Sequence, residues 1–384
     1  MTTVCVIGLV GLVTSIYFLY LKVKSIFYKI PPHPKLEDTW WGPRDQSKED
    51  SSIKPFKINI SDEVLKDLQF RLENALPFQP PLEGVKHNYG INTNLLNNIV
   101  DFWRTKYNWR EREKFFNQYP QFTVSVQGLN IHYLHVKPTE TKDLKVLPLL
   151  LLHGWPGSVR EFYEIIPLLT TPQKGRNFVF EVIVPSLPGY GFSEAAVRPG
   201  LGPLQIAILF KNFMERLDYS KYYIQGGDWG GALVKIIATL FPEKIIGVHS
   251  NMCDVRTPLS YVKLFLGSFF PFLIVSKEHR HRMYPLGHRF SFLMLESGYM
   301  HIQATKPDTI VGLAAYIIEK FITWTNPEWK DLDDGGLTKK YTFTNLLDNV
   351  MIYWVTRSIT TSMRIYSEAF GKNQSGGVIE RYNI

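Results

Sequence analysis

An aspartate stands at the centre of a glycine-rich turn in the middle of the chain. The run Gly226-Gly227-Asp228-Trp229-Gly230 follows the strand-like residues Lys221–Gln225, and an apolar helical pattern over Ala232–Leu240 comes after it. A strand that reverses sharply into a helix forces its central residue toward positive φ, and small flanking residues avoid steric clashes there. The spacing therefore predicts a nucleophile turn with Asp228 at its tip.

The chemistry of this turn depends on the acid at its tip. A serine there would indicate an esterase, whereas an aspartate attacks an electrophilic sp3 carbon and leaves an alkyl-enzyme ester that water must later cleave. Such a nucleophile narrows the substrate to epoxides or alkyl halides. The alternative is a glycine-rich turn of no chemical meaning, because short motifs also occur by chance.

A second loop carries backbone amides that are expected to act on the same ester. His153-Gly154-Trp155-Pro156 directly follows an apolar run that ends at Leu152. We expect the backbone amides of Trp155 and Trp229 to form an oxyanion hole. The histidine is expected to tie down the loop backbone rather than to shuttle protons, and the first tryptophan to line the substrate pocket.

Around these loops, short apolar strands alternate with helical stretches. A hairpin is expected over Phe122–Val126 and Leu129–Val136. Alternation along the rest of this region predicts a mainly parallel sheet covered on both faces, which is an α/β fold. The further strands are expected at Val146–Leu152, Val179–Val184, Tyr222–Gln225 and Ile245–Ser250.

Composition divides the remainder of the chain into segments. Successive prolines after residue 30 indicate an extended tether, and Ser61 followed by two acids resembles a helix start. The region after residue 255 is rich in aromatic residues and helical in pattern, which indicates a lid. We expect an anchor at 1–21, a linker at 22–54, a helical meander at 55–120, an α/β core at 121–254, a helical cap at 255–370 and a divergent tail at 371–384.

The first residues read as a transmembrane helix. Residues 1–21 carry no charged side chain, and Val4–Leu21 approaches the length of about 20 residues that a helical span needs. A cleaved secretory signal is the alternative, but the segment lacks a basic start and a small-x-small cleavage site. Lys22, Lys24 and Lys29 follow at once, so the positive-inside rule places the rest of the chain in the cytosol.

The composition also excludes several classes of protein. The chain has 43 Lys and Arg against 35 Asp and Glu, a net charge of +8, but the basic residues form no long tract. We therefore expect no nucleic-acid partner. The cysteines, Cys5 and Cys253, argue against a disulfide framework and favour a reducing compartment.

Several longer motifs carry a family resemblance. They are WWGP at 40–43, HGWPGS at 153–158, PSLPGYGFSEA at 185–195, GGDWGG at 226–231 and YPLGHRFSFLMLESGYMHIQATKPDT at 284–309. With the N-terminal anchor, they resemble the microsomal epoxide hydrolases, especially the juvenile hormone epoxide hydrolases of insects. The resemblance implies an α/β-hydrolase fold with a helical meander and a cap. It also implies an enzyme of the endoplasmic reticulum membrane that faces the cytosol and uses neither cofactor nor metal.

The resemblance further implies roles for a pair of cap tyrosines. In such enzymes two phenols hydrogen-bond the epoxide oxygen and protonate the alkoxide as the ring opens; a phenol with a pKa of about 10 is still a neutral donor at pH 7. Matched by motif, these are Tyr299 of GYMH and Tyr366 of SMRIY. The alternative is that either ring only packs within the cap. The family pattern alone places them above Tyr284, Tyr316 and Tyr353.

One part of the expected machinery is not found in this sequence. A complete enzyme of this kind needs a histidine base and an acid that orients it, in the order nucleophile, acid, histidine. The last histidine is His301, inside the predicted cap, and Glu368 and Glu380 are the only acidic side chains after Tyr366. We therefore expect a C-terminally shortened form whose strand at 245–250 presents an unpaired apolar edge. Turnover is expected to stall after ring opening, and replacement of the base by a cap histidine is not expected.

Three functions stay open at this point. The leading one is a membrane-anchored epoxide hydrolase for lipophilic epoxides, either juvenile hormone or xenobiotic. A haloalkane dehalogenase shares the carboxylate nucleophile and the adjacent tryptophan but has no use for paired phenols. A catalytically inactive protein that binds lipophilic epoxides would account for a cap kept without the base. A serine esterase built on Ser193 is disfavoured, because that serine lacks the strand-turn-helix context.

Overall fold

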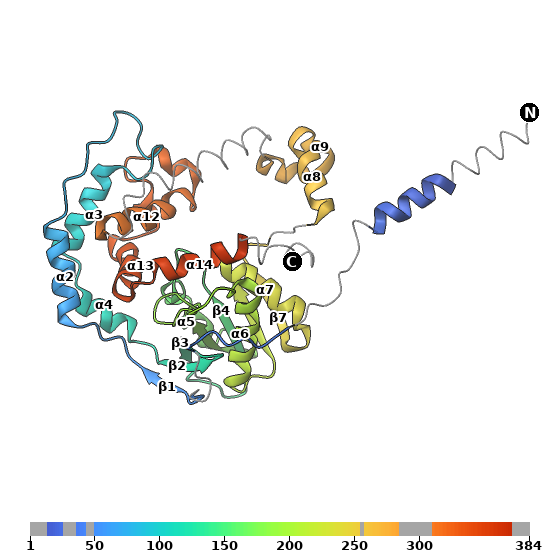
Figure 1. Ribbon diagram of the computed structural model, residues 1–384, viewed down its shortest axis with the longest axis horizontal. Coiled ribbons are helices and arrows are strands. Elements are labelled where there is room, and N and C mark those ends of the chain that lie inside the picture. Colours follow the sequence, from blue (N-terminus) through green and yellow to red (C-terminus); the bar gives the residue numbers. More distant parts are fainter. Residues whose placement is uncertain (1–13, 26–35, 44–49, 254–256, 284–308, 371–384) are drawn as a thin grey trace, which may run out of the picture. The chain divides into compact units, whose positions relative to one another are not determined.

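The computed structural model describes residues 14–25, 36–43, 50–253, 257–283 and 309–370 (Figure 1). The chain forms two compact units. The first comprises Met1–Lys35, Asp254–Phe290 and Ser375–Ile384, and the second comprises Leu36–Cys253 and Ser291–Gln374.

Within the described residues, a seven-stranded sheet in the order β1-β2-β3-β5-β4-β6-β7 forms the centre of the second unit (Figure 1). All the strands that the sequence predicted are present, with ends that agree to about one residue. The additional strand, β1, is too short to show a hydrophobic alternation. The strands are β1 (Lys54–Phe56), β2 (Gln121–Val126), β3 (Leu129–Val136), β4 (Lys145–Leu152), β5 (Phe178–Pro185), β6 (Tyr222–Gly226) and β7 (Ile245–Ser250).

The sheet is mixed rather than mainly parallel. β5, β4, β6 and β7 run parallel, as expected, but β1, β2 and β3 pair antiparallel with one another and β3 pairs antiparallel with β5. The cause lies in the turn between β2 and β3. Gln127 and Gly128 both have positive φ, 52° and 80°, which is the geometry of a two-residue hairpin.

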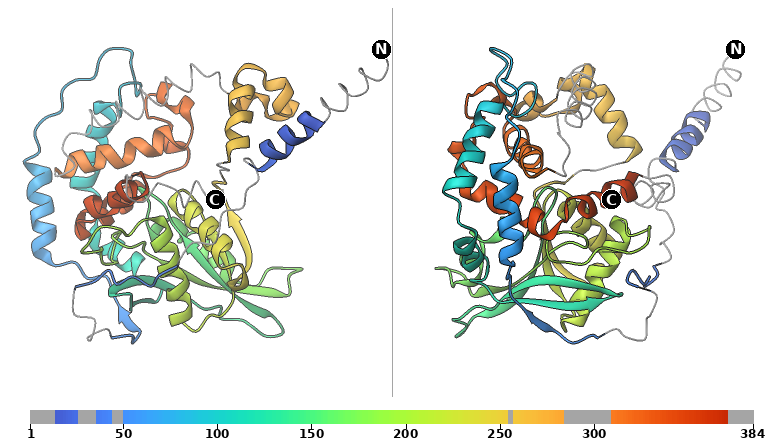
Figure 2. Two further views of the ribbon diagram at one scale, coloured as in Figure 1. Left: turned by 45° about the vertical axis from the view of Figure 1, so that its right-hand side comes forward. Right: turned by 60° about the vertical axis from the view of Figure 1, so that its left-hand side comes forward.

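Helices cover the parallel strands and close the core. Leu149–Leu152 of β4 and Val182–Pro185 of β5 are buried at every position, which requires cover on both faces of the sheet. Phe213 packs edge to face on Tyr133 of β3 at 5.2 Å between ring centroids, and such a buried side chain contributes about 1.5–3 kcal/mol. Figure 2 shows these helices along the sheet. They are α5 (Ile166–Thr170), α6 (Pro203–Arg216) and α7 (Trp229–Leu240).

The N-terminal helices pack on the later helices of the same unit. α2 contacts α12, and α3 contacts α2 and α13. Residues 74–92 are not helical, because Pro77, Pro80 and Pro81 interrupt the pattern. The helices are α2 (Asp62–Glu73), α3 (Thr93–Thr105), α4 (Trp109–Phe116), α12 (Ile310–Thr323), η6 (Pro327–Asp331), η7 (Leu337–Lys339), α13 (Phe343–Thr356) and α14 (Ile359–Phe370).

The first unit holds a helix at 14–25 together with α8 (Pro258–Phe269), α9 (Pro271–Ile274) and η4 (Lys277–Arg282). Thr257 begins α8 with a reciprocal capping box to Ser260. None of the helices in the described part of the chain is both long and apolar enough to traverse a bilayer. The predicted anchor falls partly on residues 1–13, outside the described residues, and stays a prediction.

In the described sheet, β7 pairs on one side only, with β6. Its alternate residues Ile246 and Val248 are 47% and 48% exposed. The apolar edge that the sequence predicted for Ile245–Ser250 is therefore present in the part of the sheet that the structure describes.

Candidate active site

Asp228 lies at the sharp junction between β6 and α7. Its φ of 51° and ψ of −125° lie in a region that a residue with a side chain rarely adopts. The glycines around it permit the turn, because a Cβ on Gly226 would overlap the carbonyl of Gly230, and a Cβ on Gly230 would overlap the carbonyl of Leu152. Backbone strain is thus present at Asp228, whose carboxylate projects from the end of the strand.

Backbone amides hold the carboxylate of Asp228. The amide of Trp155 donates to Oδ1 at 2.8 Å, and the amide of Trp229 also hydrogen-bonds to the group. Burial raises the pKa of Asp228 above its usual value, while these two hydrogen bonds act in the opposite direction. The amides therefore converge on the atoms where negative charge would develop during cleavage of an ester on this aspartate.

The loop that supplies the Trp155 amide is fixed from α13. Asn349 donates its side-chain amide to the carbonyl of Pro156 and accepts a hydrogen bond from the Ser158 hydroxyl at 2.9 Å. Tyr353 donates its hydroxyl to the carbonyl of Gly157 at 2.7 Å. These contacts leave the loop little freedom to move its amides away from the nucleophile.

His153 has the structural role that the sequence predicted. It is buried, its Nε2 accepts from the amide of Leu187 at 3.0 Å, and its Nδ1 donates to the carbonyl of Gly154 at 2.9 Å. Burial lowers the pKa of His153 to about 4. The neutral imidazole therefore joins two loops and has no free nitrogen for proton transfer.

Aromatic side chains gather around the nucleophile. The ring of Tyr366 on α14 lies 5.0 Å from Trp229 and 5.6 Å from Trp155, edge to face in both cases. Trp155 also donates its indole N–H to the hydroxyl of Ser362 at 3.2 Å. Burial and then the charge of Asp228 raise the pKa of Tyr366, so its phenol is a neutral donor at pH 7.

The other tyrosines that the sequence considered have different surroundings. Tyr316 lies 5.3 Å from Trp155, and its hydroxyl meets only the sulfur of Met363 among the contacts that the structure describes, at 4.0 Å. The hydroxyl of Tyr353 donates to the carbonyl of Gly157. Tyr299, the second predicted proton donor, lies outside the described residues, as do Tyr284 and His301.

Sequence reasoning missed one acid near Asp228. Glu161 lies in η2 (Val159–Phe162), and the amides of Ser158 and Gly154 hydrogen-bond to its carboxylate. The side chain is exposed to solvent, and the charge of Asp228 raises the pKa of its carboxyl group. The signal was available, because this glutamate follows the HGWPGS motif by three residues.

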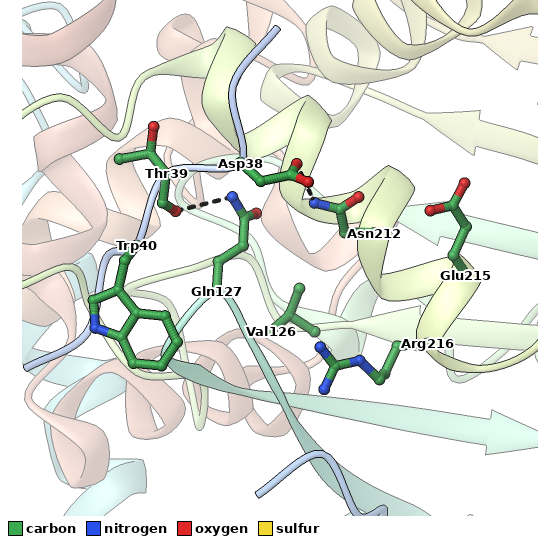
Figure 3. A pocket seen from close by; sticks show the side chains of 8 residues that line it. All are labelled: Asp38, Thr39, Trp40, Val126, Gln127, Asn212, Glu215 and Arg216. Atoms are coloured by element: carbon green, nitrogen blue, oxygen red, sulfur yellow. Dashed lines mark hydrogen bonds between the residues drawn. The ribbon is translucent and has the colours of Figure 1, made fainter. Parts of the chain in front are cut away.

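The structure also contains a cavity of about 640 Å³ that none of the predicted catalytic residues lines (Figure 3). Its walls are held by hydrogen bonds from Asn212 to Asp38 at 2.7 Å and from Gln127 to the Thr39 carbonyl at 2.9 Å (Figure 3). Among the described residues, no cluster of His, Cys, Asp and Glu side chains could hold a metal ion. The cavity is lined by Asp38, Thr39, Trp40, Val126, Gln127, Asn212, Glu215 and Arg216.

The parallel strands, the strained turn and the acid at its tip define an α/β-hydrolase fold with a carboxylate in the nucleophile position. A family model described as the alpha/beta hydrolase fold matches residues 148–355, and one described as the epoxide hydrolase N terminus matches residues 53–162. The chain belongs to the epoxide hydrolase family, which confirms the resemblance seen in the sequence.

Individual relatives agree with this assignment. The chain is 54% identical over 362 residues to juvenile hormone epoxide hydrolase 1 of Ctenocephalides felis, covering 91% of this chain and 78% of that protein. It is 44% identical over 365 residues to epoxide hydrolase 1 of Oryctolagus cuniculus, covering 91% and 80%. The crystal structure of juvenile hormone epoxide hydrolase from the silkworm Bombyx mori matches with a TM-score of 0.83 at 51% identity, covering 88% of this chain and 82% of that one.

Proposed function

We propose that this protein opens lipophilic epoxides to diols through an ester on Asp228, and that its substrates are juvenile hormone or xenobiotic epoxides. The observation that carries the proposal is the placement of Asp228. Its carboxylate stands on a strained turn and receives two backbone N–H groups, and its charge adds to burial in raising the pKa of the nearby Tyr366 phenol. The substrate class comes from the relatives, which include proteins named juvenile hormone epoxide hydrolase and epoxide hydrolase 1.

In the first step, an oxygen of Asp228 attacks a ring carbon and the carbon–oxygen bond of the epoxide breaks. The oxygen that leaves the carbon takes a proton from Tyr366, assisted by Tyr299 as the second donor. A neutral phenol suits this task, because it is a weak acid beside a carboxylate but a strong one beside an alkoxide. The rings of Trp155 and Trp229 support an apolar substrate and limit the access of bulk water.

In the second step, water attacks the ester carbon of Asp228, and the amides of Trp155 and Trp229 stabilise the oxyanion. The ester on Asp228 is therefore the intermediate that links the two steps.

We further propose that residues 1–21 anchor the protein in the endoplasmic reticulum membrane, with the α/β core in the cytosol. The support is the uncharged N-terminal segment and the three lysines that follow it. A lipophilic epoxide dissolved in the same bilayer is then delivered at high local concentration. Carbonate extraction and protease protection of the full chain in microsomes test this, and complete release by carbonate would contradict it.

Mass spectrometry of the intact protein tests the catalytic proposal. The polypeptide in detergent is mixed with a terpenoid epoxide, or with an aryl epoxide, and the protein mass is followed with time. We expect an increase equal to the mass of one epoxide, and no increase for Asp228→Asn. Reversible epoxide binding by both proteins without any mass increase would instead support an epoxide-binding protein, and release of halide from alkyl halides would support a dehalogenase.

A further inference from the structure

We propose that Ser362 is a positioning residue for ring opening, because its hydroxyl fixes the ring of Trp155 on which the phenol of Tyr366 packs. The inference rests on the function proposed above, since it assumes that Tyr366 donates a proton to the epoxide oxygen. In this role Ser362 acts through its two aromatic neighbours rather than on the epoxide itself.

Ser362 and Tyr366 lie one turn apart on α14. Residues four apart in an α-helix lie on the same side, so the serine and the phenol share one face of this helix. Ser362 is fully buried, and its hydroxyl donates to the carbonyl of Ile359 at 2.8 Å. Because its hydrogen is used in this way, the oxygen is left as an acceptor, and the indole N–H of Trp155 donates to it at 3.2 Å.

Trp155 is held at both of its ends. Its backbone amide donates to Oδ1 of Asp228 at 2.8 Å, and its indole donates to Ser362. The residue between these two bonds is only 5% exposed. Trp155 therefore connects the nucleophile to the helix that carries the proposed proton donor.

The ring of Trp155 is also one of the two aromatic walls around Tyr366. The two rings pack edge to face with 5.6 Å between their centroids, and Trp229 packs on the same phenol ring at 5.0 Å. A displaced Trp155 ring would remove one of these walls. The hydrogen bond to Ser362 therefore constrains where the phenol lies relative to Asp228.

A separate contact attaches α14 to a different loop. Thr361 donates its hydroxyl to the carbonyl of Gly189 at 2.6 Å. A Cβ on Gly189 would come within 3.1 Å of the Thr361 carbonyl oxygen, so the helix packs directly on the backbone of that loop. Removal of the Ser362 hydroxyl should therefore leave α14 in place and release the ring of Trp155.

The two steps of the reaction should respond differently to that release. Asn349 and Tyr353 hold the loop backbone, so the Trp155 amide should stay on Asp228 and ester hydrolysis should change little. A buried indole N–H without an acceptor is unfavourable, so the ring should shift toward another partner. Ring opening should then slow, because a misplacement of about 1 Å in a reacting group can cost on the order of 10²-fold in rate.

The test measures formation and decay of the Asp228 ester separately in the full chain, by rapid quenching and intact mass after mixing with an aryl epoxide. We expect Ser362→Ala to form the ester about tenfold more slowly at saturating epoxide and to lose it within about twofold of the parent rate. Ser362→Thr keeps the hydroxyl and should recover most of the loss. Thr360→Ala is the matched control and should match the parent, because Thr360 lies two residues away on the same helix with an exposed side chain.

A double-mutant cycle separates positioning of the phenol from a general structural effect. In the Tyr366→Phe background the phenol is already absent, so Ser362→Ala should change ester formation by no more than about twofold. The full loss repeated in that background would overturn the role. Ester formation at the parent rate in a folded Ser362→Ala variant would also overturn it.

A second variant covers the case in which Ser362→Ala does not fold. Trp155→Phe removes the same hydrogen bond from the other partner and keeps an aromatic ring, so ester formation should again slow by about tenfold or more. Formation at the parent rate would overturn the inference. A folded parent that never forms an ester on Asp228 would overturn the proposed function itself, which is a different result from an ester that forms regardless of Ser362.

Discussion

Asp348 and Asp228 are two enclosed carboxylates of the second unit, and their partners differ in kind. Asp348 is fully buried and receives Nε and Nη2 of Arg112 at 2.8 Å and 2.6 Å, Nε of Arg160 at 3.0 Å and the hydroxyl of Tyr107 at 3.1 Å. Asp228 is half-buried and receives backbone amides. Cations occupy the carboxylate oxygens of Asp348, whereas the carboxylate oxygens of Asp228 stay available for a reaction.

The elements that the two acids join also differ. The Asp348 cluster, consisting of Asp348, Arg112, Arg160 and Tyr107, links α13 to α4 and to η2, and so ties the N-terminal helices to the later ones. Asp228 joins its turn to the loop after β4 through the neutral amide of Trp155, and its backbone is strained. The comparison teaches that this fold separates the carboxylate that stabilises it from the carboxylate that does chemistry, and that the choice of partner, cation or neutral dipole, decides which is which.

The largest effect is expected from Asp228→Asn. Removal of the nucleophile should lower the rate of epoxide opening by on the order of 10⁴-fold or more, equivalent to about 5.5 kcal/mol of activation free energy. The thermal midpoint should not fall, because burial already disfavours the charged form of Asp228. Stopped-flow consumption of the epoxide and a melting curve check both parts. A variant that melts much earlier than the parent would make Asp228 a structural acid and end the comparison.

The next effect is expected from Asp348→Asn. This change leaves Arg112 and Arg160 partly or fully enclosed without their counter-charge, and the free energy of unfolding should fall by about 3–5 kcal/mol. Urea denaturation at neutral pH measures it. Glu164→Gln is the control, since it removes an exposed partner of the same Arg160 and should change stability by no more than about 1 kcal/mol. Equal effects of the two changes would contradict the role of the Asp348 cluster.

A smaller effect on chemistry is expected from Tyr366→Phe. Ring opening should slow by about 10²-fold, because the variant lacks a phenol that protonates the leaving oxygen of the epoxide. Tyr316→Phe is the matched control, because it lies against the same Trp155 but its hydroxyl contacts only a sulfur among the contacts described, and its rate should stay within about threefold of the parent. Similar rates for the two variants would show that Tyr366 only packs.

The smallest effect on the reaction is expected from protonation of His153. Because its pKa is lowered to about 4 in the folded protein from 6.5, this imidazole stays neutral through the working range. The contribution of the neutral His153 to stability is fully present above pH 6.5. It is lost as the pH falls from 6.5 toward 4, because in this range the unfolded chain binds the proton and the folded protein does not. NMR titration of the imidazole should show no inflection between pH 8 and 5, and a midpoint near 6.5 would contradict the buried structural role.

Local patterns were enough to predict much of the fold. Alternating apolar residues placed the six longer strands, and the glycines around Asp228 placed the turn, because both depend on near neighbours along the chain. β1 was missed, since three residues carry no recognisable period. The sequence located the turn at Gly128 that joins the antiparallel strands β2 and β3. It did not show that further strands of the sheet would also pair antiparallel.

The site was only partly readable, for a physical reason. Tyr366 was selected through the family pattern, as nothing in its local sequence distinguishes it from the other tyrosines. The Asp348 cluster joins residues 236 positions apart, so no local pattern could reveal it. Glu161 was overlooked because its place on the loop beside Asp228 arises only after folding, when Gly157 lies against Glu161 and Gly154 lies against Asp228.

The central claim is that the oxygen added to the substrate comes from Asp228, and a single turnover in ¹⁸O-labelled water tests it most directly. The protein is used in excess over the epoxide, so that each site reacts once, and the diol and the tryptic peptide containing Asp228 are then weighed. The account predicts a diol without ¹⁸O and an Asp228 peptide that has gained the label. A diol that carries one ¹⁸O atom, with an unlabelled peptide, would mean direct attack by water and would contradict it.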